Sequence, residues 1–376
     1  LITTKKGRNT GKPVINYSTS WATQEPANRL HSLDRNAFIQ KVKDINWQTA
    51  YLAPDYLTPN PAFNLATKFD ATQQAAYADG KTDFDWYGAA TNQGYLMDHN
   101  LSISNSSEKT NFYVSGGFTK QKGFIINDRF ARKSIRMNIE TKALSWLTLG
   151  AQTFGTFNDY SGSSPDLRFV MLYSPLNTPN NAAGDIVLTP NASINNPFLS
   201  SAAIDYDHRN ALSGNFYTIV NIPYVSGLSY RLNFGNNYYW NQRYNSNKYG
   251  AGFTGSVSKL NEADYDYTID NIVNYTHTFS DVHDIDVTMV YGARKQQFEN
   301  TTASATGYTN ISLGYNSIEQ GQIQKVSSDA WNEAYNYQTA RLSYGYRKKY
   351  LLTGTFRRDG YSGFGASMKY GNFPSI

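Results

Sequence analysis

Residues 111–155 alternate between two kinds of side chain. One row holds Phe112, Val114, Gly116 and Phe118, then Ile135, Met137 and Ile139, then Leu147, Leu149 and Ala151. The residues between them are polar or small, and they include Arg136, Asn138 and Glu140. A period of two residues predicts β-strands with one apolar and one hydrated face. A soluble sheet has this pattern, and so does a membrane barrel with lipid outside and water or a plug inside.

The same pattern recurs along most of the chain. It predicts about eleven strands, over residues 12–21, 99–104, 111–120, 130–141, 147–159, 212–221, 228–240, 265–275, 285–291, 337–346 and 350–356. The connections between them are alternately short and long. The large loops are expected at about 25–94, 156–209, 242–263, 298–331 and 359–371. Outer-membrane barrels have short turns at one end and long loops at the other, so the sequence predicts an all-β, antiparallel transmembrane β-barrel with long extracellular loops and short periplasmic turns.

The composition agrees with strands that have one apolar face. The chain has 376 residues, of which 15% are aromatic and only 17% are charged, against roughly 25% charged in typical soluble domains. Trp21, Trp240 and Trp331 fall at the loop side of their strands, and Trp146 and Tyr224 fall at the turn side. Barrels place aromatic girdles at both membrane interfaces. Tyr and Trp also favour strands in general, which is the alternative explanation.

The first long loop contains two helical patterns. Residues 33–45 place Phe38, Val42 and Ile45 on one face, and Ser32 precedes them as a possible N-cap. Residues 70–80 begin with an Asp and end with a Gly, which is typical of helix ends.

Several classes of function are disfavoured by composition. The chain has no Cys, which excludes disulfides, thiol nucleophiles and Cys-bound metals. No stretch approaches the ~20 apolar residues of a spanning helix. The net charge of +5 comes from scattered Lys and Arg, whereas a nucleic-acid-binding protein clusters them, so no nucleic-acid partner is expected.

Candidate catalytic groups are few. Asp281, His283, Asp284 and Asp286 lie close together in the sequence, but they fall on a tight turn, where Asp is favoured for backbone hydrogen bonding. Asp264 and Asp266 flank Tyr265 and face the same way, as a glycosidase pair would, without a sign of a pocket. Motifs for phosphate binding, zinc hydrolysis or a nucleophile elbow are missing. We therefore expect no enzymatic activity, no metal and no cofactor.

Two aromatic runs are candidates for substrate contact. The first is Tyr238, Tyr239 and Trp240, because flat rings suit sugars and other amphipathic ligands. The second is Trp86 and Tyr87 in the first long loop. Girdle packing is the alternative for the first run, and partner contact is the alternative for the second. The polar row contributes Arg136, Glu140, Arg231 and Arg341, as lumen-facing groups that contact a plug or simply hydrate a wall.

Several stretches resemble SusC/RagA-type TonB-dependent transporters. Residues 1–8 (LITTKKGR) are similar to the last strand of that family's plug domain. Residues 99–104 and 108–118 resemble its early barrel strands, and the match continues through residues 121–127, 136–139 and 146–150. Residues 349–354, 357–360, 364–365 and 371–375 resemble its mid-barrel region.

The resemblance implies a bacterial outer-membrane importer with a plug inside a barrel of about 22 strands. Residues 1–10 would be the last plug strand and residues 11–376 the first half of the barrel, so we expect an internal fragment. The implied partners are a SusD-like lipoprotein over the extracellular loops, outer-membrane lipid, and TonB-ExbB-ExbD acting through an N-terminal segment upstream of Leu1. The implied substrates are oligosaccharides or peptides.

A soluble, secreted, β-rich carbohydrate-binding or adhesion protein is the alternative. The two hypotheses differ in what covers the apolar row. Lipid covers it in a transporter and a packed core covers it in a soluble protein. The residues that distinguish them are Ile135, Met137, Ile139, Leu228, Leu232, Tyr344 and Leu352.

Overall fold

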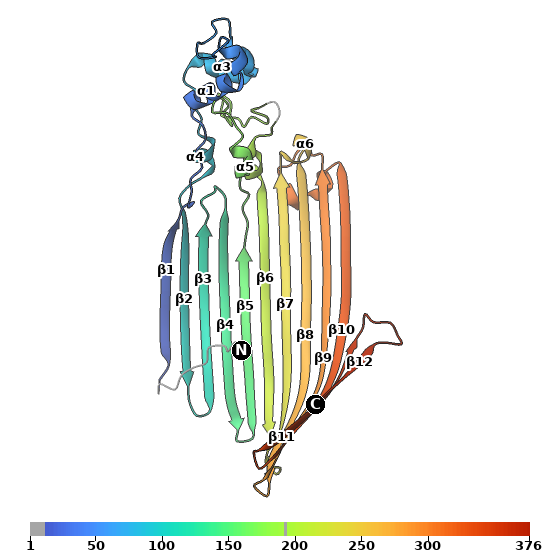
Figure 1. The fold of residues 1–376 in the computed structure, drawn as a ribbon. Helices are drawn as coiled ribbons and strands as arrows, with labels where there is room; N and C mark the ends of the chain where they lie inside the picture. Colours follow the sequence, from blue (N-terminus) through green and yellow to red (C-terminus); the bar gives the residue numbers. More distant parts are fainter. Residues whose placement is uncertain (1–11, 192–193) are drawn as a thin grey trace.

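The computed structural model describes residues 12–191 and 194–376, and its largest unit is one antiparallel sheet (Figure 1). Each strand pairs with its neighbours in the sequence. The strands are β1 (Val14–Gln24), β2 (Gly94–Ser106), β3 (Thr110–Lys122), β4 (Arg129–Leu144), β5 (Leu147–Asp159), β6 (Ile204–Asn221), β7 (Leu228–Asn247), β8 (Ser256–Phe279), β9 (His283–Thr306), β10 (Ile323–Tyr346), β11 (Tyr350–Tyr361) and β12 (Tyr370–Ser375). The plug strand expected in residues 1–10 lies outside the described residues.

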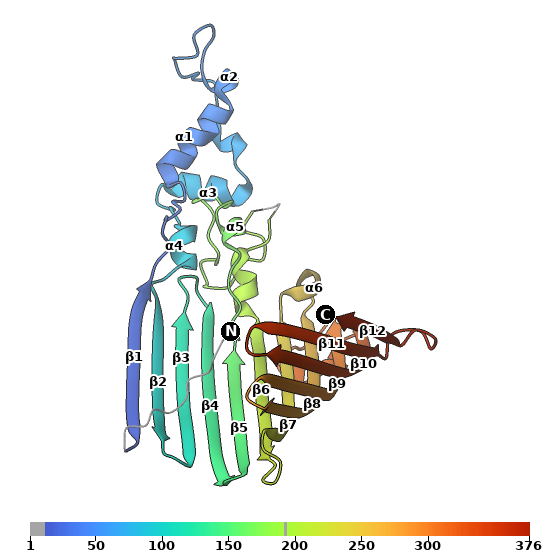
Figure 2. The ribbon, with the colours of Figure 1, turned by 60° about the horizontal axis from the view of Figure 1, so that its bottom comes forward.

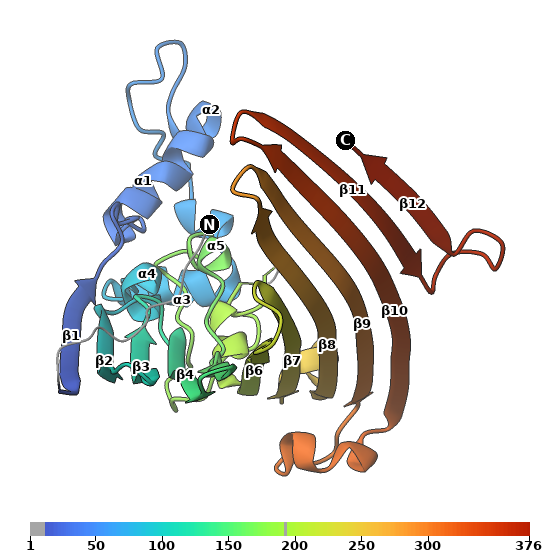
Figure 3. The same ribbon diagram turned by 90° about the horizontal axis from the view of Figure 1, so that it is seen from below.

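The sheet is long along its strands and curved across them. Seen from below, the strands follow an arc from β1 to β12, so that one face of the sheet is concave (Figure 3). β1 and β12 are the two edges of the strand order. This all-β, antiparallel architecture confirms the fold class predicted from the alternation.

The pairing gives the sheet two chemically distinct faces. Residues opposite each other in an antiparallel pair point to the same side, so each face can be followed from strand to strand through the register. One side, the apolar face, carries Tyr17, Leu101, Phe118, Ile135, Leu149, Phe216, Leu232, Val273, Met289, Leu342, Leu352 and Phe356. The other side, the polar face, carries Thr119, Arg136, Glu140, Gln152, Asn215, Arg231, Asp266, Arg294, Glu333, Arg341 and Asp359.

The strands are longer and more numerous than the pattern predicts. The described residues form twelve, since Tyr370–Ser375 forms β12, and β8, β9 and β10 each have 24 residues. The predicted loops 242–263, 298–331 and 359–371 are correspondingly too wide. Within these three predicted loops, only residues 248–255, 307–322 and 362–369 lie outside strands. The alternation disappears in these extensions because the apolar face becomes polar there, as at Lys295, Gln297 and Glu299, while backbone pairing continues regardless of side-chain polarity.

The connections differ between the two ends of the sheet. At one end, the turn end, the connections are residues 107–109, 145–146, 222–227, 280–282 and 347–349. At the other, the loop end, they are residues 25–93, 123–128, 160–203, 248–255, 307–322 and 362–369. The predicted alternation of short and long connections is confirmed.

The two longest connections contain most of the helices. These are α1 (Arg35–Ile45), α2 (Trp47–Ala50), α3 (Ala71–Asp79), α4 (Trp86–Ala90) and α5 (Leu167–Val170), with the 3₁₀ helices η1 (Leu65–Lys68) and η2 (Pro197–Ala202). The other helical turns are α6 (Gly250–Phe253), η3 (Gly314–Asn316) and η4 (Ile318–Gln320). In the part of the chain that the structure describes, no helix is long and apolar enough to cross a membrane.

The structure corrects one predicted helix start and confirms the other helix. The N-cap of α1 is Asp34 and not Ser32, because the Asp34 carboxylate accepts from the backbone N–H of Ala37 at 2.8 Å. α3 has its predicted N-cap, Asp70, in a capping box with Gln73, and it ends at Gly80, whose φ of 70° is left-handed.

Candidate functional site on the polar face and at the loop end

The four predicted polar residues share one face of the sheet. Arg136 and Glu140 alternate along β4, and the register carries their side through β5 and β6 to Arg231 on β7. The same side continues to Arg341 on β10. The structure therefore brings the four residues onto one surface, although they come from three separate strands.

A four-strand arrangement joins Glu140 to Arg231. The hydroxyl of Tyr217 on β6 donates to Oε2 of Glu140 on β4 at 2.5 Å, so the ring crosses the intervening strand β5. It crosses at Gly150, where an added Cβ would lie 2.1 Å from Cζ of Tyr217. The Arg231 guanidinium lies 4.5 Å from the centroid of the same ring. Tyr217 is only 7% exposed, so this stretch of wall is closely packed in spite of its polarity.

The same arrangement recurs four strands further along. The hydroxyl of Tyr337 on β10 donates to the carboxylate of Asp270 on β8 and crosses β9 at Gly292. A Cβ on Gly292 would lie 2.2 Å from Cζ of that ring. The Arg357 guanidinium on β11 lies 5.3 Å from the ring centroid. An Arg, a Tyr, a Gly and a carboxylate thus occupy four adjacent strands twice, and we call these two sets the tyrosine bridges.

Sequence reasoning missed the tyrosine bridges. Tyr217 lies 77 positions from Glu140, and Tyr337 lies 67 positions from Asp270. Each glycine is an unremarkable small residue within its own strand. The bridges could be recognised only from the register of the strands, because their signature is a glycine directly opposite a tyrosine on the neighbouring strand.

Other acidic groups of the polar face are also engaged. Asp266 accepts from Nε of Arg294, and Asp264 accepts from Nε2 of Gln296 at 3.0 Å. These two carboxylates face the same way, as expected, but each has its own partner on β9. Such paired groups suit a rigid hydrated wall rather than acid–base chemistry, which needs a positioned and available pair.

The acidic turn between β8 and β9 is held by local contacts. Thr278 donates to Asp284 at 2.7 Å and Thr276 donates to Asp286 at 2.9 Å. Nδ1 of His283 lies 2.7 Å from the Tyr344 hydroxyl. Among residues 12–191 and 194–376, no group of His, Asp and Glu has the arrangement of a metal site.

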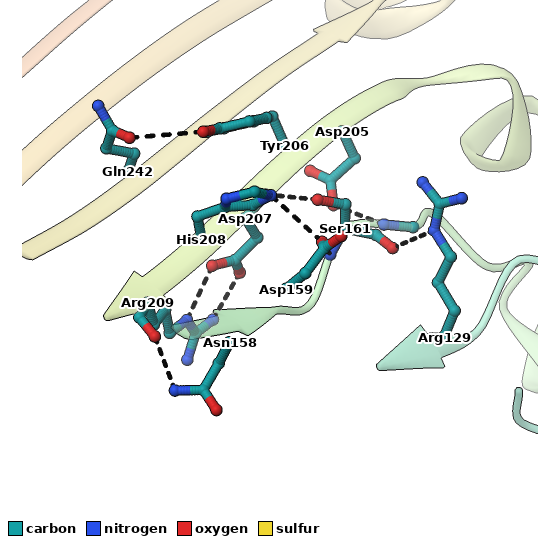
Figure 4. Close-up of polar contacts among 11 residues, drawn as sticks. Arg129, Asn158, Asp159, Ser161, Asp205, Tyr206, Asp207, His208, Arg209 and Gln242 are labelled. Atoms are coloured by element: carbon teal, nitrogen blue, oxygen red, sulfur yellow. Dashed lines mark hydrogen bonds and ion pairs between the residues drawn. The ribbon is translucent and has the colours of Figure 1, made fainter. Parts of the chain in front are cut away.

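At the loop end, Ser161 is the centre of a polar cluster between β4, β5 and β6 (Figure 4). Its backbone N–H donates to Asp159 at 2.8 Å, and its carbonyl accepts from Nε of Arg129 at 2.6 Å. Its hydroxyl accepts from the backbone N–H of Asp207 at 3.1 Å. Because these partners lie on three strands, the cluster fixes the point where the second long loop leaves the sheet.

Charged pairs extend this cluster along β6 (Figure 4). The Arg209 guanidinium donates twice to the Asp207 carboxylate, at 2.8 and 2.6 Å. Nε2 of His208 lies 3.5 Å from Oδ1 of Asp159. With its charges paired side by side, the cluster anchors the second loop and offers no activated nucleophile.

The two longest loops fold together into one unit above the sheet (Figures 1 and 2). We call residues 25–93 with 160–191 and 194–203 the loop subdomain. Its buried side chains come from both loops, for example Leu65 and Phe69 from the first and Leu176 from the second. A buried hydrogen bond of 2.9 Å from Gln73 to Asn177 also joins the loops.

Trp86 lies at the centre of the loop subdomain. It is fully buried, it stacks on Tyr173 with ring centroids 4.2 Å apart, and its Nε1 donates to the carbonyl of Ser174 at 2.9 Å. Burial raises the pKa of the Tyr173 hydroxyl to about 12, so this group remains a neutral donor to the carbonyl of Ile194 at 2.6 Å. The buried position removes Trp86 from the groups that a ligand can touch.

Tyr87 belongs to the same buried cluster as Trp86 and is 8% exposed, but it also lines a cavity of about 570 Å³ at the base of the loop subdomain. Other lining residues are Glu25, Arg29, His31, Ser32, Asp83 and Asn92. Oγ of Ser32 and Oδ1 of Asn92 are buried without a hydrogen-bond partner among the described residues. The volume is in the range of small-ligand pockets, roughly 300–1,000 Å³.

The aromatic run on β7 is divided between the two faces. Tyr238 and Trp240 lie on the apolar face and stack with centroids 5.3 Å apart, whereas Tyr239 lies on the polar face opposite Asp264. The predicted position of the run at the loop-side end of its strand is wrong, because β7 continues to Asn247. Of the three, only Tyr239 shares a surface with Arg231.

The loop subdomain also has an exposed apolar tip, residues 45–60. Ile45 is 69% exposed, Trp47 is 45% exposed and Leu57 is 79% exposed. Trp47 packs edge-on against Tyr56 with ring centroids 4.6 Å apart. α2 lies at the end of the subdomain that is furthest from the sheet (Figure 2), so the tip is accessible to another protein.

Comparison with known proteins agrees with this architecture. The chain is 24% identical over its full length to TonB-dependent receptor P3 of Formosa agariphila and 21% identical to TonB-dependent receptor SusC of Bacteroides thetaiotaomicron. It spans 36% and 37% of the length of these two relatives. No protein-family model matches it.

A solved structure has the same fold. The RagAB peptide transporter superimposes with a TM-score of 0.75 and 19% identity, over 99% of this chain and 44% of that chain. The chain therefore resembles SusC/RagA-type TonB-dependent receptors along its whole length, and its sheet has the fold of part of an outer-membrane β-barrel.

Proposed function

We propose that the chain is part of a TonB-dependent importer of the SusC/RagA type in a bacterial outer membrane, where it forms the first half of the barrel. In this proposal the apolar face contacts lipid and the polar face lines a plugged lumen. The observation that carries it is the separation of an apolar and a polar face, which continues from strand to strand across one sheet.

The exposure of the apolar face supports a lipid environment. Ile135 is 55% exposed, Met289 is 54% exposed and Leu352 is 61% exposed. Soluble monomers rarely expose contiguous apolar patches of more than a few hundred Å². The helices of the loop subdomain lie beyond the loop end rather than over the sheet (Figures 1 and 2), so they leave the apolar face to the bilayer.

The proposed mechanism is physical rather than chemical. Substrate, an oligosaccharide or a peptide, enters at the loop end and moves along the polar face when a pull from TonB-ExbB-ExbD displaces the plug. Arg136, Glu140, Arg231 and Arg341 would contact the plug or hydrate the passage. Tyr239 on the polar face and Tyr87 at the cavity wall are the proposed aromatic substrate contacts. The tyrosine bridges keep this wall rigid while the plug moves.

We also propose that a SusD-like lipoprotein docks on the tip of the loop subdomain. The tip is the most distal apolar surface of the subdomain, and its side chains include Leu57, 79% exposed. Because both long loops contribute to each of its two buried clusters, the subdomain presents the tip as a rigid platform.

Paired arginine substitutions test the assignment of the two faces. In the full-length protein, Met137→Arg puts a charge on the apolar face and Asn138→Arg puts one on the polar face next to it. Near the bilayer midplane, the lipid-facing charge costs about 2–4 kcal/mol. We expect Met137→Arg to reduce the folded, heat-modifiable band on detergent gels, and Asn138→Arg to leave it nearly unchanged. Equal effects, or a wild-type protein that stays in solution without detergent, would refute the proposal.

Co-purification tests the partner. The full-length protein is purified through a tag from cells that also express the SusD-like lipoprotein. Leu57→Asp at the tip is compared with Leu172→Asp, a matched change at a leucine that is 57% exposed elsewhere on the subdomain. We expect loss of the lipoprotein only with Leu57→Asp. Retention of the lipoprotein by both variants would exclude the tip as its seat.

A further inference from the structure

A pocket of about 390 Å³ lies on the apolar face between β8 and β12. Its lining includes Tyr267 on β8, Tyr291 and Lys295 on β9, Asn336 on β10 and Tyr370 on β12, which the register places on this face. Lys369 lines it from the loop before β12. Neither the predicted sites nor the polar face includes this pocket.

The floor of the pocket is built by a tyrosine that lies over a glycine. Nδ2 of Asn336 donates to the Tyr370 hydroxyl at 3.3 Å, and a Cβ on the intervening Gly360 would lie 2.5 Å from Cε1 of the ring. The Arg358 guanidinium lies 4.3 Å from the ring centroid. Arg358 is therefore held against Tyr370, a lining residue of the pocket.

The pocket lies where the apolar face changes from apolar to basic. On β9 the row runs Val287, Met289 and Tyr291 before it reaches Lys295. β9 begins at His283, so residues 283–291 cover about the 9–11 residues that a tilted strand needs to cross a bilayer. β11 makes the same change from Phe356 to Arg358. On the proposed orientation, the pocket is at the level of the outer-leaflet headgroups.

The positive charge in this region is not neutralised by nearby carboxylates. Within the described parts of the chain, no ion pair joins Lys295, Arg358 or Lys369 to an acidic group. Most acidic groups of β8 to β11 point to the polar face, where Asp266 pairs with Arg294 and Asp359 with Arg357. Glu299 on β9 lies on the apolar face, four residues beyond Lys295 and outside the lining of the pocket. Lys295 and Lys369 in the lining, with Arg358 against Tyr370, thus remain available to an anion.

We propose that this pocket binds the phosphorylated headgroup of an outer-leaflet lipid. Ammonium and guanidinium groups form charge-assisted hydrogen bonds with phosphate oxygens. Tyrosines are favoured at the headgroup level, because their rings are apolar and their hydroxyls are polar. The open rim allows a headgroup to enter while its acyl chains follow the Met289 row. The inference rests on the proposed function, since the pocket must lie at a membrane surface.

Lipid binding to the full-length protein tests the proposal. The protein is purified in detergent, and binding of diphosphorylated lipid A, dephosphorylated lipid A and inorganic phosphate is measured by native mass spectrometry and thermal shift. Lys295→Gln with Lys369→Gln removes two cations of the pocket. Lys259→Gln is the matched control on the same face, because Lys259 packs on Tyr244 outside the pocket.

We expect the double variant to bind diphosphorylated lipid A roughly tenfold or more weakly, with no change for Lys259→Gln. Unchanged affinity in the double variant would overturn the proposal. Equal binding of inorganic phosphate and of the phosphorylated lipid would show an anion site that is not specific for lipid. Membrane fractionation of the cells that produce the protein distinguishes failure of this inference from failure of the proposed function. If the protein is found in the outer membrane and the double variant has unchanged lipid affinity, only this inference is refuted.

Discussion

Trp86 in the loop subdomain is fully buried, whereas Ile135 on β4 is 55% exposed, and neither position is unusual for its region. The loop subdomain buries its apolar side chains, as a water-soluble domain does, with Leu176 1% exposed and Val170 fully buried. The sheet exposes an apolar row on one face and holds most of its charges on the other, with Lys295, Glu299 and Arg358 beyond the apolar row as exceptions. One chain thus contains two arrangements of apolar side chains, buried in the loop subdomain and exposed on the sheet.

The largest effect should come from the centre of the loop subdomain. Trp86→Ala removes the ring that packs on Tyr173 and Phe198, and loss of a buried Trp costs about 3–5 kcal/mol. We expect residues 86–90 and 170–176 to lose hydrogen-exchange protection while the barrel stays folded on detergent gels.

Trp47→Ala at the tip is the matched control, with an expected cost of about 1 kcal/mol from its edge-on contact with Tyr56. If Trp86→Ala also unfolded the sheet, the two regions would form a single cooperative unit and the comparison would fail.

A smaller effect should come from the tyrosine bridges, which make part of the solvated polar face as tightly fitted as a core. Gly150→Ala places a methyl group where the Tyr217 ring lies, and such overpacking costs about 1–3 kcal/mol. Gly292→Ala should act in the same way on Tyr337. The measurement is the urea midpoint of the reconstituted barrel.

Gly235→Ala is the control for these variants, because its nearest neighbour is the Asn215 side chain at 3.9 Å. We expect it to be neutral or slightly stabilising, since Gly within a strand is less favourable than Ala by roughly 0.5–1 kcal/mol. Similar midpoints for Gly150→Ala and Gly235→Ala would show that the polar face is loosely packed after all.

The smallest effect concerns pH at the surface of the loop subdomain. The Asp79 carboxylate accepts from the Thr82 hydroxyl at 2.5 Å and from the backbone N–H groups of Lys81 and Thr82, and these bonds lower its pKa to about 2. An Asp in an unfolded chain has a pKa near 3.9. The stabilisation is therefore present above about pH 4 and is lost as the pH falls from about 4 to about 2.

Hydrogen exchange of residues 79–83, corrected for intrinsic rates, measures this effect. We expect weaker protection at pH 3 than at pH 5 in the wild type, and no such difference in Asp79→Asn. A wild-type protection that does not change with pH would exclude the carboxylate as its source.

The two faces of the sheet were predictable because they depend on a local period. Any stretch such as Ile135 to Ile139 shows its face without knowledge of its partner strands. The strand ends were not predictable, because β8 to β10 continue where the apolar face turns polar, at Lys295 for example. The alternation marks only the part of a strand whose two faces differ, whereas the hydrogen-bonded ladder continues beyond that part.

The loop subdomain was not predictable because its contacts are distant in sequence. Trp86 donates to a carbonyl 88 positions away, and Gln73 bonds a side chain 104 positions away. From the sequence, Trp86 and Tyr87 were equivalent aromatic candidates. Both belong to one buried cluster in the structure, but only Tyr87 also lines the cavity.

The shared core of the two long loops has an evolutionary consequence. A transplant of residues 25–93 alone into a related barrel would carry Trp86 without Tyr173 and Gln73 without Asn177. A transplant of residues 160–203 alone would leave Leu176 without its packing partners in the first loop. The unit that can be exchanged is thus the pair of loops, and recombination or engineering that aims to change the loop end of such a sheet has to replace both at once.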